Sequence, residues 1–195
     1  MATTIRTATE ADVPQILRFI RALAEFEREP GAVEATVEGL LRDGFGPQPM
    51  YSCLMAEENG QAAGFALYFF NYSTWLGRPG LYLEDLFVMP EFRGLGIGKA
   101  LLQRVAAIAV EKGCKRLQWE VLDWNTPAID FYRAMGAEFL DEWRNVRVPE
   151  QALKRLAGGA DADSPVRPDE ETGFGLQRAD EASDSNEALS SGGSR

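Results

Sequence analysis

Three glycines and two cations lie together in the segment Arg93-Gly94-Leu95-Gly96-Ile97-Gly98-Lys99. Glycine lets the backbone approach a ligand closely and adopt conformations that other residues avoid. An apolar pattern typical of a strand precedes the segment, and an amphipathic pattern typical of a helix follows it. The free amides at the start of a helix attract anions, and Arg93 and Lys99 add positive charge. The segment therefore predicts a loop that binds a pyrophosphate.

The glycine spacing excludes two common nucleotide-binding loops. A Walker P-loop has the pattern G-x-x-x-x-G-K-[ST], but Ala100 follows Lys99 here, so the hydroxyl ligand for Mg²⁺ is missing. The dinucleotide fingerprint is G-x-G-x-x-G, whereas the spacing here is G-x-G-x-G. Taken alone, the glycines also fit a simpler interpretation, a turn that only joins a strand to a helix.

The chain contains no histidine and two cysteines, Cys53 and Cys114. Ser-His-Asp and Cys-His nucleophile systems are therefore excluded, and so are zinc sites with histidine ligands. Two cysteines in a chain of 195 residues do not suggest a disulfide framework. We expect no metal site, and acid–base chemistry must come from Asp, Glu, Tyr, Lys or Cys side chains.

Tyr132 is a candidate acid, and Glu84 or Asp85 is a candidate carboxylate for a cleft. Tyr132 follows Asn125 by two helical turns, so both can face the same side of a short helix. Glu84 and Asp85 are neighbours on a predicted strand, so we expect their side chains to point to opposite faces, with only one entering a cleft. A ring packed in the core is the alternative for Tyr132, and an edge-strand charge or a salt bridge is the alternative for Glu84.

Strands and helices must position these residues. Alternating and apolar patterns predict strands at residues 5–7, 51–57, 63–72, 81–89, 116–123 and 138–148. Helical spacing predicts a first helix from the N-cap Thr9 to Pro30-Gly31, a second from about Thr36 to Gly44, a long helix from the glycine segment to Gly113, and short helices at 127–135 and 149–157. This order indicates a mixed α/β fold with one central sheet and helices on both faces.

Charge is concentrated near the C-terminus. The net charge is −10, and residues 158–195 hold nine acids and three bases. That segment is rich in Gly, Ser, Asp and Glu, so we expect a disordered tail after a domain at residues 1–157. The rest of the chain has no basic excess, which argues against a nucleic-acid partner. With no secretory signal and no apolar run near the roughly 20 residues that span a bilayer, we expect a cytoplasmic protein.

The pattern Arg93-x-x-Gly96-x-Gly98 after an apolar strand resembles the acetyl-CoA loop of the GNAT acetyltransferase superfamily. The resemblance extends over about residues 3–157. The segments similar to diamine acetyltransferases, and most of all to the thialysine Nε-acetyltransferase branch, are Leu23-Ala24-Glu25-Phe26-Glu27, Asp43-Gly44-Phe45-Gly46, Tyr72-Ser73-Thr74-Trp75, Leu81-Tyr82-Leu83-Glu84-Asp85, Val121-Leu122-Asp123-Trp124-Asn125 and Phe131-Tyr132.

The resemblance implies a mostly antiparallel central sheet, a homodimer, and direct transfer of acetyl from acetyl-CoA to a small cationic amine. Thialysine, lysine-like amino acids, diamines and polyamines all fit as acceptors. It also implies that Tyr132 protonates the sulfur of CoA and that Glu84 takes the amine proton, through water. The backbone at Leu86 to Val88 would bind the pantetheine arm, and the Val88 amide would polarise the thioester carbonyl. A protein acetyltransferase and a CoA-binding module without catalysis are the alternatives.

The resemblance carries two sets of site residues onto this chain. Those implied for acetyl-CoA are Leu86, Phe87, Val88, Arg93, Gly94, Leu95, Gly96, Ile97, Gly98, Lys99, Asn125, Thr126, Pro127, Ala128 and Tyr132. Those implied for the amine are Phe26, Glu27, Trp75, Glu84, Trp119 and Glu142. Carboxylates would attract the charge of the amine, and aromatic faces would cover its methylenes.

Overall fold

The computed structural model describes residues 2–158. The chain divides into two compact units, Met1–Ala137 and Glu138–Arg195. The tail predicted from residue 158 onward therefore lies outside the described residues, apart from Gly158. The predicted domain boundary after residue 157 stays a prediction.

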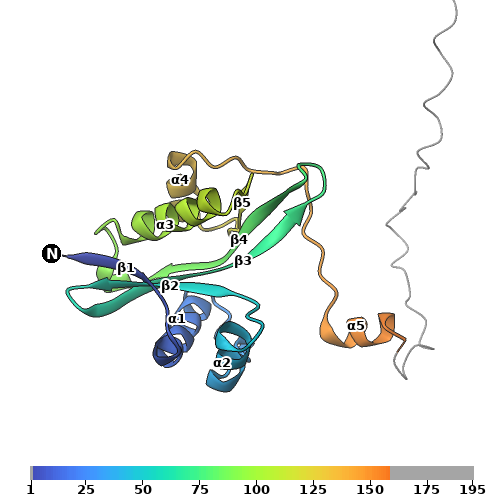
Figure 1. Cartoon of the computed structure of the whole chain (residues 1–195), viewed down its shortest axis with the longest axis horizontal. Helices are drawn as coiled ribbons and strands as arrows, with labels where there is room; N and C mark the ends of the chain where they lie inside the picture. Colours follow the sequence, from blue (N-terminus) through green and yellow to red (C-terminus); the bar gives the residue numbers. More distant parts are fainter. Residues whose placement is uncertain (1, 159–195) are drawn as a thin grey trace, which may run out of the picture. The chain divides into compact units, whose positions relative to one another are not determined.

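The first unit is built on one five-stranded sheet (Figure 1). Its strands, in spatial and chain order, are β1 (Thr3–Thr7), β2 (Ser52–Glu58), β3 (Gln61–Ser73), β4 (Arg78–Val88) and β5 (Leu117–Gln118). Strands β1 to β4 pair antiparallel, and β5 pairs parallel to β4. The predicted mixed, mostly antiparallel sheet is confirmed.

Helices cover both faces of this sheet (Figure 1). Helices α1 (Val13–Phe26) and α2 (Val37–Phe45) lie on one side, and α3 (Ile97–Glu111) and α4 (Thr126–Ala134) lie on the other. Short 3₁₀ turns occur at Glu10–Asp12, Pro30–Ala32 and Pro90–Phe92. The core under α1 is formed by Ala8, Ile16, Phe19, Cys53, Met55, Phe65, Leu67 and Phe87. On the other side, Leu101 and Val105 of α3 are fully buried.

The first predicted helix is confirmed at its start and is wrong at its end. Thr9 and Asp12 form a capping box around the 3₁₀ turn before α1, with the Thr9 amide 2.7 Å from the Asp12 carboxylate. Arg6 also donates to Asp12 at 2.7 Å and holds the pKa of that carboxyl well below its usual range. α1 then ends at Phe26, before Pro30, because Arg28 adopts a left-handed backbone with φ of 68°.

Two strand predictions fail near the C-terminal side of the domain. The strand predicted at 116–123 is confined to Leu117–Gln118, and residues 138–148 form no strand. A strand is stabilised by the backbone hydrogen bonds of a neighbour, and β5 pairs only with Leu81 and Tyr82. The alternating pattern at 138–148 has no such neighbour within residues 2–158, and Trp143 and Val146 are exposed there. The last predicted helix is present as α5 (Glu150–Leu156).

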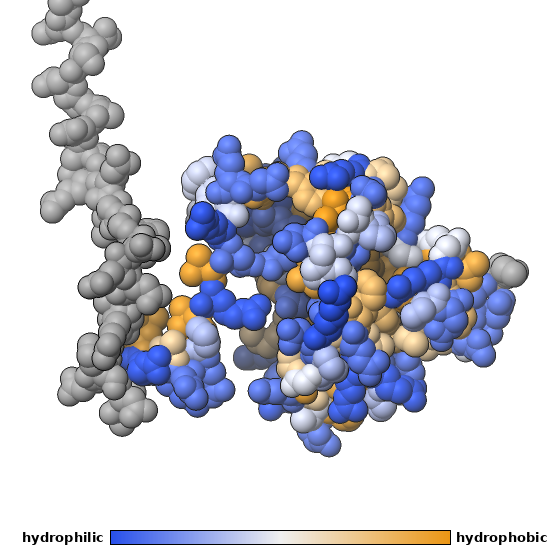
Figure 2. All heavy atoms as spheres, turned by 180° about the vertical axis from the view of Figure 1, so that it is seen from behind, coloured by the Kyte–Doolittle hydropathy of each residue, from blue (hydrophilic) through white to orange (hydrophobic). Residues whose placement is uncertain are grey.

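No helix within residues 2–158 has the length and apolar character to cross a membrane. On the face shown in Figure 2, hydrophilic side chains predominate and apolar ones are interspersed among them.

Gly64 of β3 leaves no room for a side chain against the backbone of β4, and alanine is expected to destabilise the fold there. A Cβ at this position would overlap the Phe87 carbonyl oxygen and lie 3.1 Å from Val88 Cα, both backbone atoms that cannot rotate away. We expect Gly64→Ala to lower the free energy of unfolding by about 1–3 kcal/mol, measured by urea denaturation. Gly31→Ala is the control, since no atom lies within 4 Å of its added Cβ. Equal midpoints for the two variants would contradict this packing.

Candidate active site

The outer edge of β4 is open next to its C-terminal half. β5 pairs only with Leu81 and Tyr82, so no strand within residues 2–158 covers that edge farther along. The Met89 amide donates to the Ala63 carbonyl at 2.9 Å, which marks these residues as a hydrogen-bonded pair. Because such pairs alternate in an antiparallel ladder, the amide and carbonyl of Val88, opposite Gly64, face away from β3. The same alternation turns the backbone groups of Leu86 toward the open edge.

The glycine segment follows this edge and opens α3. Gly94 and Gly96 have φ values of 78° and 81°, in the left-handed region that favours glycine. No atom lies within 4 Å of a Cβ added at either position. The Ala100 amide donates to the Gly96 carbonyl, and the three amides before it, Ile97 to Lys99, have no acceptor inside the helix. Free amides, a helix N-terminus and open space over two glycines fit a pyrophosphate.

The side chains of this loop divide between surface and core. Arg93, Leu95 and Lys99 are exposed, whereas Ile97 is buried. Ile97 therefore offers a ligand only its backbone. Arg93 Nε donates to the Val88 carbonyl at 3.1 Å, so this side chain joins the loop to the open edge of β4.

Helix α4 positions Tyr132. Asn125 caps it, with Oδ1 accepting from the Ala128 amide at 3.4 Å, and Pro127 lies in its first turn. The Tyr132 ring is 8% exposed and lies 4.9 Å from the Trp119 ring and 5.3 Å from the Phe131 ring, centroid to centroid. Burial raises the pKa of Tyr132 to about 12, so the phenol keeps its proton at neutral pH.

The expectation that Glu84 and Asp85 point to opposite faces is wrong, because β4 contains a bulge. Leu67 pairs with Asp85 and Tyr68 pairs with Leu83, which leaves Glu84 as an extra residue. Asp85 is opposite Leu67, a member of the core under α1, and so lies on the α1 face. Leu83 is opposite Tyr68 on the α3 face, so alternation returns Glu84 to the α1 face. An inserted residue breaks the period of two, and both carboxylates face α1.

Asp85 is a candidate that the sequence patterns did not reveal. Burial, followed by the charges of Glu84 and Glu27, raises the pKa of Asp85 to about 7. Burial also raises the pKa of Glu27, at the end of α1. Within residues 2–158, the Asp85 carboxyl has neither a cationic partner nor a hydrogen-bond donor, and no group of Asp, Glu, Cys or His side chains there could hold a metal ion. The bulge that puts Glu84 and Asp85 on one face arises from the pairing of β4 with β3, and the sequence pattern of a single strand carries no sign of it.

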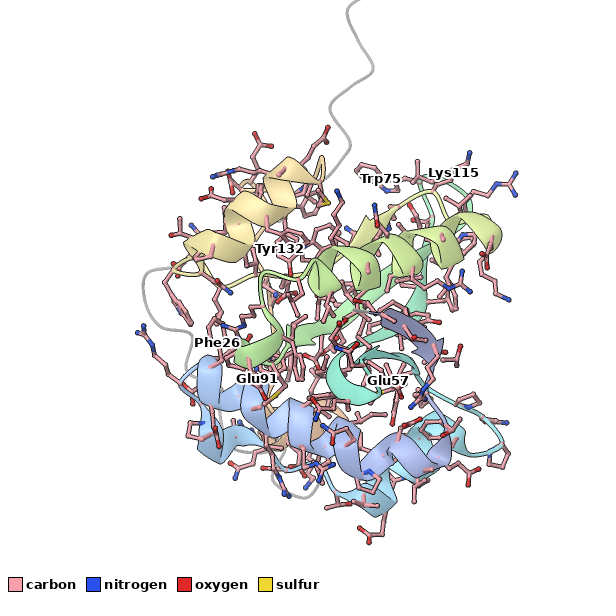
Figure 3. All side chains as sticks on the ribbon, turned by 90° about the vertical axis from the view of Figure 1, so that its left-hand side faces the viewer. Phe26, Glu57, Trp75, Glu91, Lys115 and Tyr132 are labelled. Atoms are coloured by element: carbon pink, nitrogen blue, oxygen red, sulfur yellow. The ribbon has the colours of Figure 1, made fainter. Side chains whose placement is uncertain are left out.

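The structure gathers some predicted site residues and separates others. Phe26 lies at the end of α1 (Figure 3). The Trp119 ring packs on the Tyr132 ring. Trp75, at the tip between β3 and β4, is 90% exposed. Figure 3 shows it at the opposite end of α3 from Tyr132. Glu142 belongs to the second unit and is exposed.

Comparison with known proteins identifies the family. The acetyltransferase (GNAT) family model matches residues 16–137. The chain is 46% identical over 165 residues to the thialysine N-epsilon-acetyltransferase of Bos taurus, covering 79% of this chain and 96% of the bovine protein. It is 32% identical over 201 residues to the L-ornithine N5-acetyltransferase NATA1 of Arabidopsis thaliana, covering 80% of this chain and 88% of the plant protein.

A solved structure shows the same architecture. An integron cassette protein from the mobile metagenome of V. cholerae superimposes with a TM-score of 0.68 at 26% identity, covering 80% of this chain and 98% of the other. The glycine loop, the open β4 edge and the capped α4 thus occur together in a chain with these relatives. This protein belongs to the GNAT family of acetyltransferases, a membership that implies acetyl-CoA as the acetyl donor.

Proposed function

We propose that this acetyltransferase acetylates the primary amine of a small cationic substrate, such as thialysine, a lysine-like amino acid, a diamine or a polyamine. One observation carries the proposal: the Asp85 carboxyl lies on the α1 face of β4, where the strand edge is open, and the charges of Glu84 and Glu27 both raise its pKa. Three carboxylates together attract a cation strongly. The bovine and plant relatives, named for thialysine and L-ornithine, support this class of acceptor.

The residues that would hold acetyl-CoA surround the open edge. The amides of Ile97, Gly98 and Lys99 would bind the pyrophosphate, with Gly94 and Gly96 allowing close approach. The backbone of Leu86 and Val88 would pair with the pantetheine arm as a further strand would. Acetyl-CoA supplies an acetyl group already activated as a thioester, so no covalent intermediate on the protein is needed.

Three groups of this chain would move or hold protons and charge. The Glu84–Asp85 pair takes a proton from the bound ammonium, which leaves a neutral amine to attack the thioester carbon. The Val88 amide donates to the carbonyl oxygen as negative charge develops there. Tyr132 gives its proton to the departing sulfur. The nitrogen loses its second proton as the amide forms, which replaces the proton that Tyr132 gave up. The net products are the acetylated amine, CoA and one proton.

The walls of the amine site are proposed in the same way. Phe26 and Trp119 would cover the methylenes of the substrate, and Glu27 would hold its distant charge. Trp75 and Glu142 stay predictions from family resemblance. A homodimer and a cytoplasmic location are also proposals; the two free thiols, Cys53 and Cys114, accord with a reducing compartment.

A turnover screen tests the proposal. Purified protein and acetyl-CoA would be incubated with thialysine, lysine, ornithine, putrescine and spermidine, and CoA release and acetylated product would be measured. We expect turnover with at least one of these amines. Acetylation confined to peptide N-termini or peptide lysines would favour a protein acetyltransferase instead. Calorimetric binding of CoA without any turnover would favour the non-catalytic module.

A further inference from the structure

Helix α1 ends in a motif that normally requires glycine. The Arg28 amide donates to the Glu25 carbonyl at 3.2 Å and the Glu29 amide to the Ala24 carbonyl at 2.9 Å, the two bonds of a Schellman motif. Arg28 occupies its left-handed position, with φ of 68°. A side chain there is strained, and such strain persists where surrounding contacts over-determine it. The contacts of the Arg28 side chain should therefore explain why this residue keeps a left-handed backbone.

Arg28 is held by an aromatic ring from another part of the chain. Its guanidinium carbon lies 4.7 Å from the centroid of the Trp124 ring. Trp124 in turn lies 5.8 Å from the Phe26 ring, with an interplanar angle of 48°. A guanidinium over an indole face is attracted by the ring quadrupole. The turn after α1 is thereby joined to the loop before α4.

The contacts continue to the loop proposed to bind acetyl-CoA. The Arg93 guanidinium carbon lies 4.9 Å from the Phe26 centroid and 5.7 Å from the Phe87 centroid. Arg93 Nε also donates to the Val88 carbonyl. We call the five side chains Arg28, Trp124, Phe26, Arg93 and Phe87 the arginine–aromatic stack.

The stack connects the two segments whose spacing acetyl transfer would depend on. Trp124 directly precedes Asn125, which caps the helix that carries Tyr132. Arg93 begins the glycine segment and contacts the carbonyl of Val88. A displacement of about 1 Å of a reacting group can cost about 100-fold in rate. Packing that fixes α4 against the acetyl-CoA loop thus bears directly on turnover.

We propose that Arg28 and Trp124 are positioning residues: through the stack they hold α4 and the acetyl-CoA loop at the spacing that acetyl transfer needs. This inference rests on the proposed function. It explains why a cationic side chain occupies a backbone position that suits glycine, since glycine would give an unstrained turn and no contact with Trp124.

Arg28→Gly is a direct test, because the backbone at this position accepts glycine. We expect an unchanged or higher Tm, a fall in kcat of about tenfold, and a change in the Kd for CoA of less than threefold. Arg28→Lys keeps the charge and should restore part of kcat. Asn59→Gly is the matched control: it also relieves a positive φ, of 51°, but in the turn between β2 and β3, far along the chain from the stack. Its kcat should equal that of the wild type.

Hydrogen exchange gives a readout that does not depend on turnover. In Arg28→Gly, the amides in the first turns of α4, including that of Ala128, should exchange at least tenfold faster, with β3 amides unaffected. An Arg28→Gly variant with kcat within twofold of wild type and unchanged α4 exchange would overturn the inference. So would an equal loss in Asn59→Gly, or a fall in Tm large enough to account for the lost activity. Wild-type protein without turnover would instead count against the proposed function, and the exchange measurement would still decide the inference.

Discussion

Replacing Tyr132 with phenylalanine is expected to lower kcat by at least about 100-fold, the usual contribution of a general acid. The phenol is the group proposed to protonate the departing sulfur, and phenylalanine cannot supply a proton. The ring contacts with Trp119 and Phe131 do not involve the hydroxyl, so packing is preserved. We therefore expect Tm and the Kd for CoA to stay close to the wild-type values. Steady-state kinetics, thermal unfolding and calorimetry would measure these three quantities.

Tyr51→Phe is the matched control for this experiment. It also removes one phenol hydroxyl, but from Tyr51, whose hydroxyl donates to the Leu40 carbonyl and not at the β4 edge. Its kcat should remain within about twofold of the wild type. The wild-type enzyme should also show no loss of activity from Tyr132 ionisation below about pH 11, since burial raises the pKa of Tyr132 to about 12. Turnover by Tyr132→Phe equal to wild type would remove this residue from the acid role.

Asp85→Asn is expected to change both the level and the pH dependence of activity. In the wild type, kcat/KM should rise as pH increases through about 7, because Asp85 must lose its proton before the pair can accept one from the amine. Asparagine cannot titrate, so the rise in kcat/KM near pH 7 should vanish in the variant. Its kcat/KM at pH 8 should be about 100-fold below that of the wild type. The alkyl amine of the substrate titrates nearer pH 10, so its effect on kcat/KM can be separated from that of Asp85. Profiles between pH 5 and pH 9 would measure the effect.

Asp85→Asn should be less active than the wild type but more stable. The folded pKa of Asp85, about 7, lies above the unfolded value near 4, so its contribution to stability is present below pH 4 and is lost as pH rises through 7. The asparagine side chain of the variant does not ionise and carries no such loss. Asp85→Asn should therefore be more stable than wild type by roughly 2–4 kcal/mol at pH 8, and the difference should shrink toward pH 4. Denaturation at both pH values would show it.

Glu84→Gln distinguishes the role of Glu84 from that of Asp85. The charge of Glu84 raises the pKa of Asp85, so its removal should shift the acidic step of kcat/KM to lower pH without abolishing it. An acidic step near pH 7 that persists in Asp85→Asn, or one that disappears in Glu84→Gln, would assign the proton to a different group.

The two predictions for Asp85→Asn, lower activity and higher stability, place activity and stability in opposition at one residue. A carboxyl held near neutrality by burial is suited to exchange protons at physiological pH, and its ionised form is costly to the fold. Active sites commonly keep such groups despite their cost. The Arg28 backbone is a second position where local conformational preference yields to a tertiary contact.

The sequence by itself determined the features that depend on neighbouring residues. The glycine segment specifies its own left-handed backbone and the free amides of α3, because glycine permits those angles and a helix start leaves its amides without acceptors. Thr9 with Asp12 likewise specifies the capping box before α1. Helical spacing put Tyr132 and Asn125 on one short helix, and the order of motifs along residues 3–157 indicated the family and, with it, the roles of these residues.

Only the tertiary structure decided the features that depend on register and on packing between distant segments. The bulge at Glu84 comes from the pairing of β4 with β3, and it places Glu84 on the same face as Asp85. The open β4 edge exists because β5 is two residues long. The early end of α1 follows from the left-handed Arg28, whose guanidinium lies over Trp124, nearly a hundred positions along the chain. The residue pattern of a segment indicates whether that segment is a strand or a helix, whereas these features arise from the energy of contacts between different strands and helices.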